Sequence, residues 1–183
     1  MSKIAYRQLS REEINKLSQI DRTETINHVY YLRDGALVLQ KEHHDVPQWS
    51  EADKQRRIEG LQKVFDQGAT FNGALDGNKL VGMSVLDHNP VRSGEKRLNL
   101  AGLWVSHPYR GSGIGKKLFQ LAADQARERK AKAMYVSATP SKNTVHFYKR
   151  LGCNHAEPID EYLYKKEPED IHLELKLMEE VPT

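Results

Sequence analysis

The sequence predicts a mixed α/β fold in which strands and amphipathic helices alternate. Two observations carry this prediction. In the second half of the chain, apolar stretches over 97–106 and 133–138 are each followed by a helical pattern, over 114–130 and 142–151. Ahead of them, two strand patterns flank Asp76-Gly77-Asn78, a turn sequence typical of a β-hairpin. A strand–helix–strand–helix order of this kind packs helices against a sheet.

The region before residue 70 predicts short elements. A strand pattern over 4–9 is followed by Ser10 and Glu13, a capping box that should start a helix at Arg11. A second capping sequence at Ser50 should start a helix with an apolar face made by Ile58, Leu61, Val64 and Phe65. Between them we expect a short helix over 21–31, a strand over 36–39 and a loop over 43–49.

The strand over 97–106 has apolar side chains on both faces, which is typical of a strand in the centre of a sheet. Strict alternation places Leu98, Leu100 and Trp104 on one face and Ala101, Leu103 and Val105 on the other. Gly152 should stop the helix over 142–151. The remaining expected elements are strands over 71–75, 79–87 and 171–177, and an acidic loop over 157–170.

Bulk properties narrow the class of protein. The 183 residues suit a single domain over 1–183, since no repeat or linker divides them. Lys and Arg total 28 against 25 Asp and Glu, a balance too even to favour a nucleic-acid or membrane partner. No apolar run is long enough for a membrane span or a signal peptide, and the single Cys153 argues against a disulfide or a metal cluster. We therefore expect a cytoplasmic protein without a metal.

A glycine-rich turn joins the strand over 97–106 to the following helix. It reads Val105-Ser106-His107-Pro108-Tyr109-Arg110-Gly111-Ser112-Gly113-Ile114-Gly115-Lys116. Glycines let backbone N–H groups approach a ligand, and the first N–H groups of a helix have no internal acceptor. The turn therefore predicts a site for a phosphate or pyrophosphate.

Two common nucleotide motifs do not fit this turn. A P-loop would require glycine at position 110 and Ser or Thr at 117, where the chain has Arg110 and Lys117. A dinucleotide fingerprint would require a third glycine where Lys116 stands.

A third pattern does fit. Arg110-Gly111-Ser112-Gly113-Ile114-Gly115 resembles the Q/R-x-x-G-x-G/A signature of the GCN5-related N-acetyltransferase (GNAT) superfamily. Asn143-Thr144-Val145-His146-Phe147-Tyr148 with Leu151-Gly152-Cys153 resembles its second signature, although Cys153 replaces the usual aromatic residue. The resemblance covers about residues 70–177 in element order, with the cofactor motifs in 103–152.

The resemblance implies a fold and a cofactor. The fold would be the acyl-CoA N-acyltransferase fold, with a mainly antiparallel central sheet that is splayed where acetyl-CoA binds. Backbone groups of Leu103 and Val105 would pair with the pantetheine arm. The pyrophosphate would lie on Arg110, Gly111, Ser112, Gly113, Ile114, Gly115 and Lys116. Ser141 and Asn143 are both candidates for a further contact with the cofactor.

The resemblance also implies a reaction. The chain would transfer acetyl from acetyl-CoA to a primary amine, on a small molecule or a protein, by direct attack in a ternary complex. Tyr148 would protonate the departing thiolate, which a phenol of ordinary pKa near 10 is suited to do. The strand over 97–104 contains no acid, so the general base is unassigned. The candidates are a water chain or one of Asp87, His88, Glu95, His43 and His44. A non-catalytic sensor of acyl-CoA is the alternative, and a homodimer is a family expectation.

Overall fold

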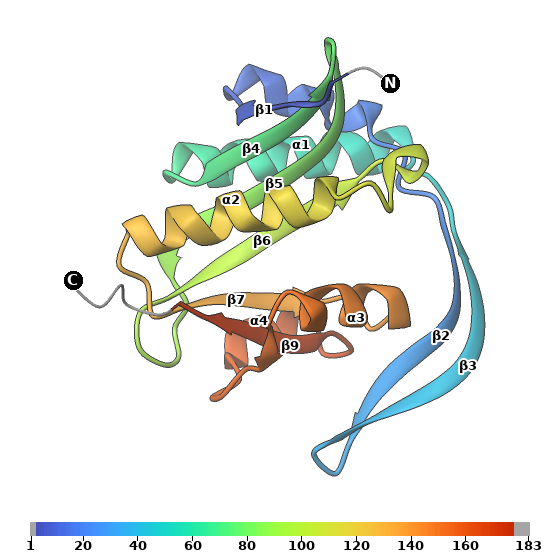
Figure 1. Cartoon of the computed structure of the whole chain (residues 1–183), viewed down its shortest axis with the longest axis vertical. Coiled ribbons are helices and arrows are strands. Elements are labelled where there is room, and N and C mark those ends of the chain that lie inside the picture. The colour runs from blue at the N-terminus through green and yellow to red at the C-terminus, as the bar shows by residue number, and fades with distance from the viewer. Residues whose placement is uncertain (1–2, 178–183) are drawn as a thin grey trace.

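The computed structural model describes residues 3–177. Its core is a seven-stranded mixed sheet in the order β1-β4-β5-β6-β7-β9-β8, and a separate two-stranded ribbon, β2–β3, stands beside it (Figure 1). All neighbouring strands are antiparallel except β6 and β7. The sheet strands are β1 (Ala5–Gln8), β4 (Thr70–Asp76), β5 (Lys79–Pro90), β6 (Arg97–Val105), β7 (Ala133–Ala138), β8 (Asn154–His155) and β9 (Ile171–Lys176). The expected mainly antiparallel sheet is confirmed.

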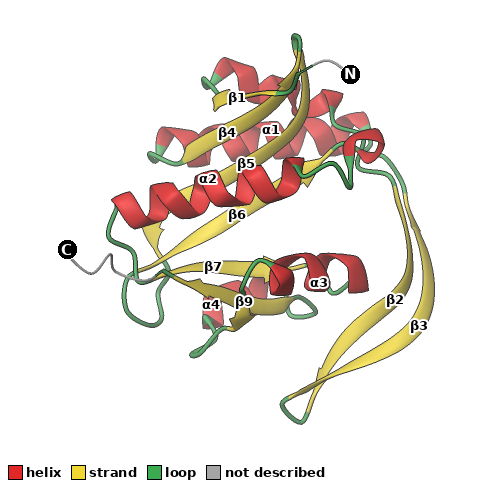
Figure 2. Ribbon diagram, in the orientation of Figure 1, coloured by secondary structure: helices red, strands yellow, loops and turns green. Residues whose placement is uncertain are grey.

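Helices cover both faces of the sheet (Figure 2). One face packs against α2 (Ile114–Glu128) and α3 (Lys142–Arg150), whose buried residues share a cluster with β6, β7 and β9. The opposite face of β4 and β5 packs against the 3₁₀ helix η1 (Glu12–Gln19) and α1 (Glu51–Asp66). The short helices η2 (His107–Tyr109) and α4 (Glu161–Lys166) lie in connections. None of the helices in the described part of the chain combines the length and apolar character that a membrane span requires.

The two central strands separate part-way along their length. β6 and β7 are paired at Arg97↔Ala133, Leu98↔Met134 and Asn99↔Tyr135, and within residues 3–177 no later pair joins them. Both strands nevertheless continue, to Val105 and Ala138, and Figure 1 shows them diverging. We call the space between the two diverging segments, 100–105 and 136–138, the slot. Beyond the fork, Ala101 is exposed although its strand is the central one.

A β-bulge at Ala101 changes the face of the sheet to which the side chains near the end of β6 point. The partners in β5 run from Val85↔Gly102 directly to Leu86↔Leu100, so Ala101 is the extra residue. Consequently Trp104 packs with the α1 cluster, whereas Leu98 and Leu100 pack with the α2 cluster. The strict alternation expected from the sequence is therefore wrong beyond the bulge, because one extra residue exchanges the two faces.

The ribbon corrects two further expectations. Residues 21–31 were expected to be helical and 43–49 to form a loop, but β2 (Glu24–Arg33) and β3 (Ala36–Val46) pair as one long hairpin. Its sequence is rich in β-branched and aromatic residues, which favour strands. The expected acidic loop over 157–170 contains α4, which Asp160 caps by accepting the Leu163 N–H at 2.9 Å. At η1, the Ser10 N–H donates to the Glu13 carboxylate as in a capping box, yet the helix is 3₁₀ and begins at Glu12.

Candidate active site

The glycine-rich turn lies open at the end of β6. Gly111 and Gly113 have φ angles of 76° and 87°, in the left-handed region that disfavours side chains. Among the described residues, no atom would lie within 4 Å of a Cβ at either position. The turn therefore has room for a ligand.

The N-terminus of α2 has no cap. Gly113 occupies the N-cap position without a side chain, and the Lys117 N–H is the first to bond back, to the Gly113 carbonyl at 3.0 Å. Within the described residues, the N–H groups of 111–116 have no protein acceptor. Together with the exposed Lys116 and Lys117, these unpaired donors make the turn electropositive.

The third glycine of the motif serves packing. A Cβ on Gly115 would lie 3.3 Å from the Phe147 ring of α3. This close approach brings the first turn of α2 against α3, so the two halves of the sequence motif lie at the same edge of the sheet. Leu103 and Val105 are half-buried and pack with Ile114 of α2.

Arg110 makes contacts within the protein. Its Nε donates to the Val105 carbonyl at 3.0 Å, and its Nη1 donates to the Thr23 carbonyl at 3.1 Å. His107 Nδ1 lies 2.7 Å from the same carbonyl oxygen. These bonds fasten the start of the ribbon to the end of β6. Ser112 also bonds internally, donating to the Tyr109 carbonyl at 2.5 Å.

The middle of β2 is bound to the segment that follows β7. The Tyr30 N–H donates to the Pro140 carbonyl at 2.8 Å, and Val29 forms an isolated bridge with Ser141. The Tyr30 hydroxyl lies 2.7 Å from His146 Nε2. Residues 24–28 therefore cross from one side of the slot to the other at its open end, as Figure 1 shows.

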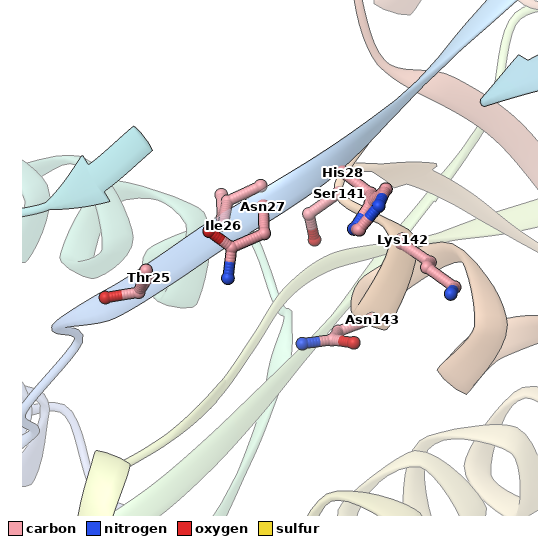
Figure 3. A pocket seen from close by; sticks show the side chains of 7 residues that line it. All are labelled: Thr25, Ile26, Asn27, His28, Ser141, Lys142 and Asn143. Atoms are coloured by element: carbon pink, nitrogen blue, oxygen red, sulfur yellow. The ribbon is translucent and has the colours of Figure 1, made fainter. Parts of the chain in front are cut away.

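A polar pocket of about 170 Å³ lies between this crossing segment and the start of α3. Figure 3 shows its lining: Thr25, Ile26, Asn27 and His28 from the ribbon, and Ser141, Lys142 and Asn143 from α3. The two candidates Ser141 and Asn143 differ here. Ser141 is buried and caps α3, accepting the Thr144 N–H at 3.3 Å, whereas Asn143 is exposed. Asn143 is therefore the one with its side chain free for a ligand.

Tyr148 lies in the core beneath the slot. It is 7% exposed and packs against Phe119, with a ring-centroid distance of 5.9 Å. Its hydroxyl has no hydrogen-bond partner within residues 3–177. Burial raises the pKa of Tyr148 well above 10, and the negative charge of Asp170 raises it further. The phenol therefore keeps its proton at neutral pH and is able to donate it.

Cys153 is a poor nucleophile in this position. It is 2% exposed, and burial raises the pKa of its thiol to about 12. A thiol reacts as the thiolate, which hardly forms here at neutral pH. Cys153 is therefore not suited to carry an acyl group.

None of the residues considered as a base from the sequence lines the pocket. His88 bonds to Thr70, and Asp87 accepts from Asn89 in the irregular part of β5 between Leu86 and Pro90. His43 and His44 bond to Asn27 and Glu42 on the ribbon. Over residues 3–177, no three His, Cys, Asp or Glu side chains gather in a way that would hold a metal ion.

The pocket residues on the ribbon lie within 21–31, where the sequence predicts a short helix and therefore no pocket. The signal was present: Thr25, Ile26, Val29, Tyr30 and Tyr31 are strand-forming residues. What the sequence did not contain was the position of this strand across the slot.

Comparison with solved structures gives the same fold. A nourseothricin acetyltransferase is 19% identical, with a TM-score of 0.70 over 96% of this chain and 99% of that chain. A putative streptothricin acetyltransferase from Bacillus anthracis str. Ames, solved with acetyl coenzyme A, is 18% identical, with a TM-score of 0.66 over 97% and 99%. The PaiA N-acetyltransferase from Thermoplasma acidophilum, solved with coenzyme A, is also 18% identical, with a TM-score of 0.62 over 95% and 99%.

The sequence comparisons give the family. No curated protein matches the chain. The family model described as the acetyltransferase (GNAT) family matches residues 28–153, which include both signatures and the whole slot. With the expected fold and this match in agreement, the chain belongs to the acetyltransferase (GNAT) family.

Proposed function

We propose that this protein transfers the acetyl group of acetyl-CoA to a primary amine by direct attack within a ternary complex. One observation carries the proposal: β6 and β7 stop pairing after Asn99↔Tyr135, and the uncapped start of α2 stands at the open end of the slot. A slot between two strands suits an extended chain with amide groups, and an uncapped helix start suits a diphosphate. Coenzyme A has both parts.

The residues present fit acetyl-CoA. The pantetheine arm would lie along Leu103 and Val105, on the edge of β6 that β7 has left. The pyrophosphate would lie on the N–H groups of 111–116, with Lys116 adding charge. Asn143 would contact the arm from the pocket at α3, with Ser141 holding that helix start in place.

Tyr148 would act as the general acid. The amine nitrogen bonds to the thioester carbonyl carbon, a backbone N–H of β6 stabilises the resulting oxyanion, and the carbon–sulfur bond breaks. Tyr148 gives its proton to the departing sulfur. Its raised pKa keeps the phenol protonated at neutral pH, so the proton is present when the carbon–sulfur bond breaks.

The relatives indicate which amines to test. Two of the similar structures are called nourseothricin and streptothricin acetyltransferases, and another is a ribosomal-protein-S18-alanine N-acetyltransferase. We infer that the acceptor of this chain is likewise an amine, on a small molecule or a protein. That the chain is one domain over 1–183, a homodimer and cytoplasmic stays a prediction.

The test is an amine panel with acetyl-CoA. Purified protein is incubated with acetyl-CoA and nourseothricin, spermidine, glucosamine or a peptide with a free N-terminus, and free thiol is measured over time. We expect thiol release that depends on one of these amines, together with saturable binding of coenzyme A in calorimetry. Tight binding without release for every amine would contradict the proposed transfer, and absence of binding would contradict the cofactor as well.

A further inference from the structure

Two buried oxygen atoms at the fork of the slot have no hydrogen-bond partner among the described residues. They are Asn99 Oδ1 on β6 and Ser137 Oγ on β7. Asn99 belongs to the last pair of the β6–β7 ladder, opposite Tyr135, and Ser137 lies two residues further along β7. Because paired residues share a face and side chains alternate along a strand, both oxygens lie on the face to which Tyr135 points.

This face is the one opposite Tyr148. Val136, between Tyr135 and Ser137, packs with Tyr148 in the cluster beneath α2 and α3. Tyr135 instead bonds to His172, whose strand partner is Ser137. The slot therefore has the proposed acid on one face and the two unpartnered oxygens on the other.

The other polar groups on the Asn99 face are already engaged. The Tyr135 hydroxyl lies 2.7 Å from His172 Nδ1, and Arg97 donates to Glu174 at 2.9 Å. Asp160 accepts from Ser93 and Leu163. Burial raises the pKa of Tyr135 and lowers that of His172, so both are neutral around pH 7. The acids and bases named here are thus all paired within the protein.

A buried acceptor without a donor is unfavourable, and native proteins satisfy most such groups with protein, bound water or a ligand. Two such acceptors on diverging strands suit a ligand with two N–H donors. We propose that Asn99 and Ser137 bind the primary amine of the acceptor in its neutral form. This inference rests on the proposed function and deepens it, because it names the residues that hold the nucleophile.

A neutral primary amine has two N–H groups and one lone pair. Two N–H···O bonds of about 2.9 Å from one tetrahedral nitrogen end on oxygens roughly 4.7 Å apart. Asn99 and Ser137 stand diagonally across the fork, because Ser137 lies two residues beyond Tyr135, the partner of Asn99. Both N–H groups are then occupied by Asn99 and Ser137, and the lone pair is left to attack. A tertiary amine has no N–H to offer, so the site selects primary amines.

The step balances without a bound base. The nitrogen attacks the thioester carbon from the Asn99 side, the carbon–sulfur bond breaks, and Tyr148 gives its proton to sulfur from the other face. The positively charged nitrogen then loses one proton to water, and the Tyr148 oxygen regains one from water. The site therefore binds the deprotonated amine instead of removing its proton.

The test compares variants of both oxygens with the wild type, using the amine that gives thiol release. Asn99→Leu and Ser137→Ala should each raise the KM for the amine about tenfold or more, while coenzyme A affinity stays within about twofold. Neither should lower the thermal midpoint, because each removes a polar atom that has no partner. Asn99→Asp keeps Oδ1 and adds a basic group, so it should retain activity and extend it to lower pH.

Trp49→Phe is the matched control. Trp49 Nε1 is the third unpartnered buried atom of the described residues, and its ring packs against Trp104 in the α1 cluster. Its loss should leave the KM for the amine unchanged. If Asn99→Leu does not fold, Ser137→Ala, which removes one oxygen atom, carries the comparison.

The outcomes separate this inference from the proposed function. An active wild type with an unchanged amine KM in both variants overturns the amine site and leaves the transferase assignment standing. A matching loss of coenzyme A affinity also overturns it, since it would assign the two oxygens to the cofactor. A wild type that releases no thiol with any amine rejects the proposed function, and the amine site with it.

Discussion

The two arms of the slot end in helices whose N-termini differ. On the β6 arm, α2 begins at Gly113 in a left-handed conformation, and no side chain caps it. On the β7 arm, α3 begins at Ser141, whose hydroxyl accepts the Thr144 N–H. The same kind of cap is made by Ser50 at α1 and by Asp160 at α4. The difference teaches that the start of α2 leaves its backbone donors unpaired, whereas the start of α3 is capped by its own serine. In the proposed function, the β6 arm therefore offers backbone N–H groups to the cofactor and the β7 arm offers side chains, Tyr148 above all.

The largest effect on activity should come from the β7 arm, which contributes Tyr148. Tyr148→Phe removes the proposed acid but keeps the ring that packs on Phe119, so kcat should fall about 10²- to 10⁴-fold while coenzyme A affinity is unchanged. Steady-state rates with saturating amine and calorimetry with coenzyme A measure the two quantities. Tyr162→Phe, at an exposed tyrosine of α4, is the control. Full activity in Tyr148→Phe would show that Tyr148 is not the acid. Loss of cofactor binding without a change in kcat would show the same.

The β6 arm, which offers backbone N–H groups, is tested at Gly113. Gly113→Ala places a Cβ on a residue with φ of 87°, which strains the turn by about 1–2 kcal/mol and moves its N–H groups, so coenzyme A should bind roughly tenfold more weakly. Gly77→Ala is matched to it, because Gly77 has φ of 59° and open space around it but lies in the β4–β5 turn. The Gly77→Ala variant should lose similar stability and keep its affinity for coenzyme A. Equal affinity in both variants would break the comparison of the two arms.

A pair of substitutions at α3 sharpens the comparison. Ser141→Ala should lower the free energy of unfolding by about 1 kcal/mol through loss of the cap, with little change in coenzyme A affinity. Asn143→Ala should do the reverse, since this side chain is exposed at the pocket. Chemical denaturation and calorimetry measure both, and Ser50→Ala is a second cap loss away from the slot. A Ser141→Ala variant of normal stability that no longer binds the cofactor would reassign this serine to the ligand.

The smallest effect concerns Asp170, just before β9. Burial, with the nearby Glu167 and Glu169, raises the pKa of Asp170 to about 6 from an ordinary 3.8. A raised carboxyl pKa favours the folded state below the unfolded pKa, and this contribution is lost as pH rises through about 6. Asp170→Asn should therefore stabilise the protein at pH 8 by about 1 kcal/mol after allowance for solvent screening, and not at pH 3.5. Denaturation curves at the two pH values measure the free energy of unfolding of the variant and the wild type. An equal gain in stability at both pH values would show that the charge of Asp170 is not responsible.

The sequence predicted the second half of the chain well because its signals are local. The glycine turn, the caps and the Asp76-Gly77-Asn78 hairpin each depend on a few neighbouring residues, and β7 spans the predicted 133–138. At 21–31 the local pattern is less clear, and the short helix expected there is wrong, because pairing with β3 makes this segment a strand. Ala101 was assigned to a face because alternation assumes no bulge, and a bulge depends on the neighbouring strand.

By itself the sequence determined the residues that could bind an anion and donate a proton, since glycine, tyrosine and helix-start chemistry are properties of single residues and short turns. Only the tertiary structure decided that β6 and β7 part after Asn99, that the ribbon crosses the slot, and that Tyr148 and the two unpartnered oxygens lie on opposite faces. These arrangements arise from pairing and packing between residues far apart in the chain, and hydrogen-bond partners across such distances leave no mark in a local pattern.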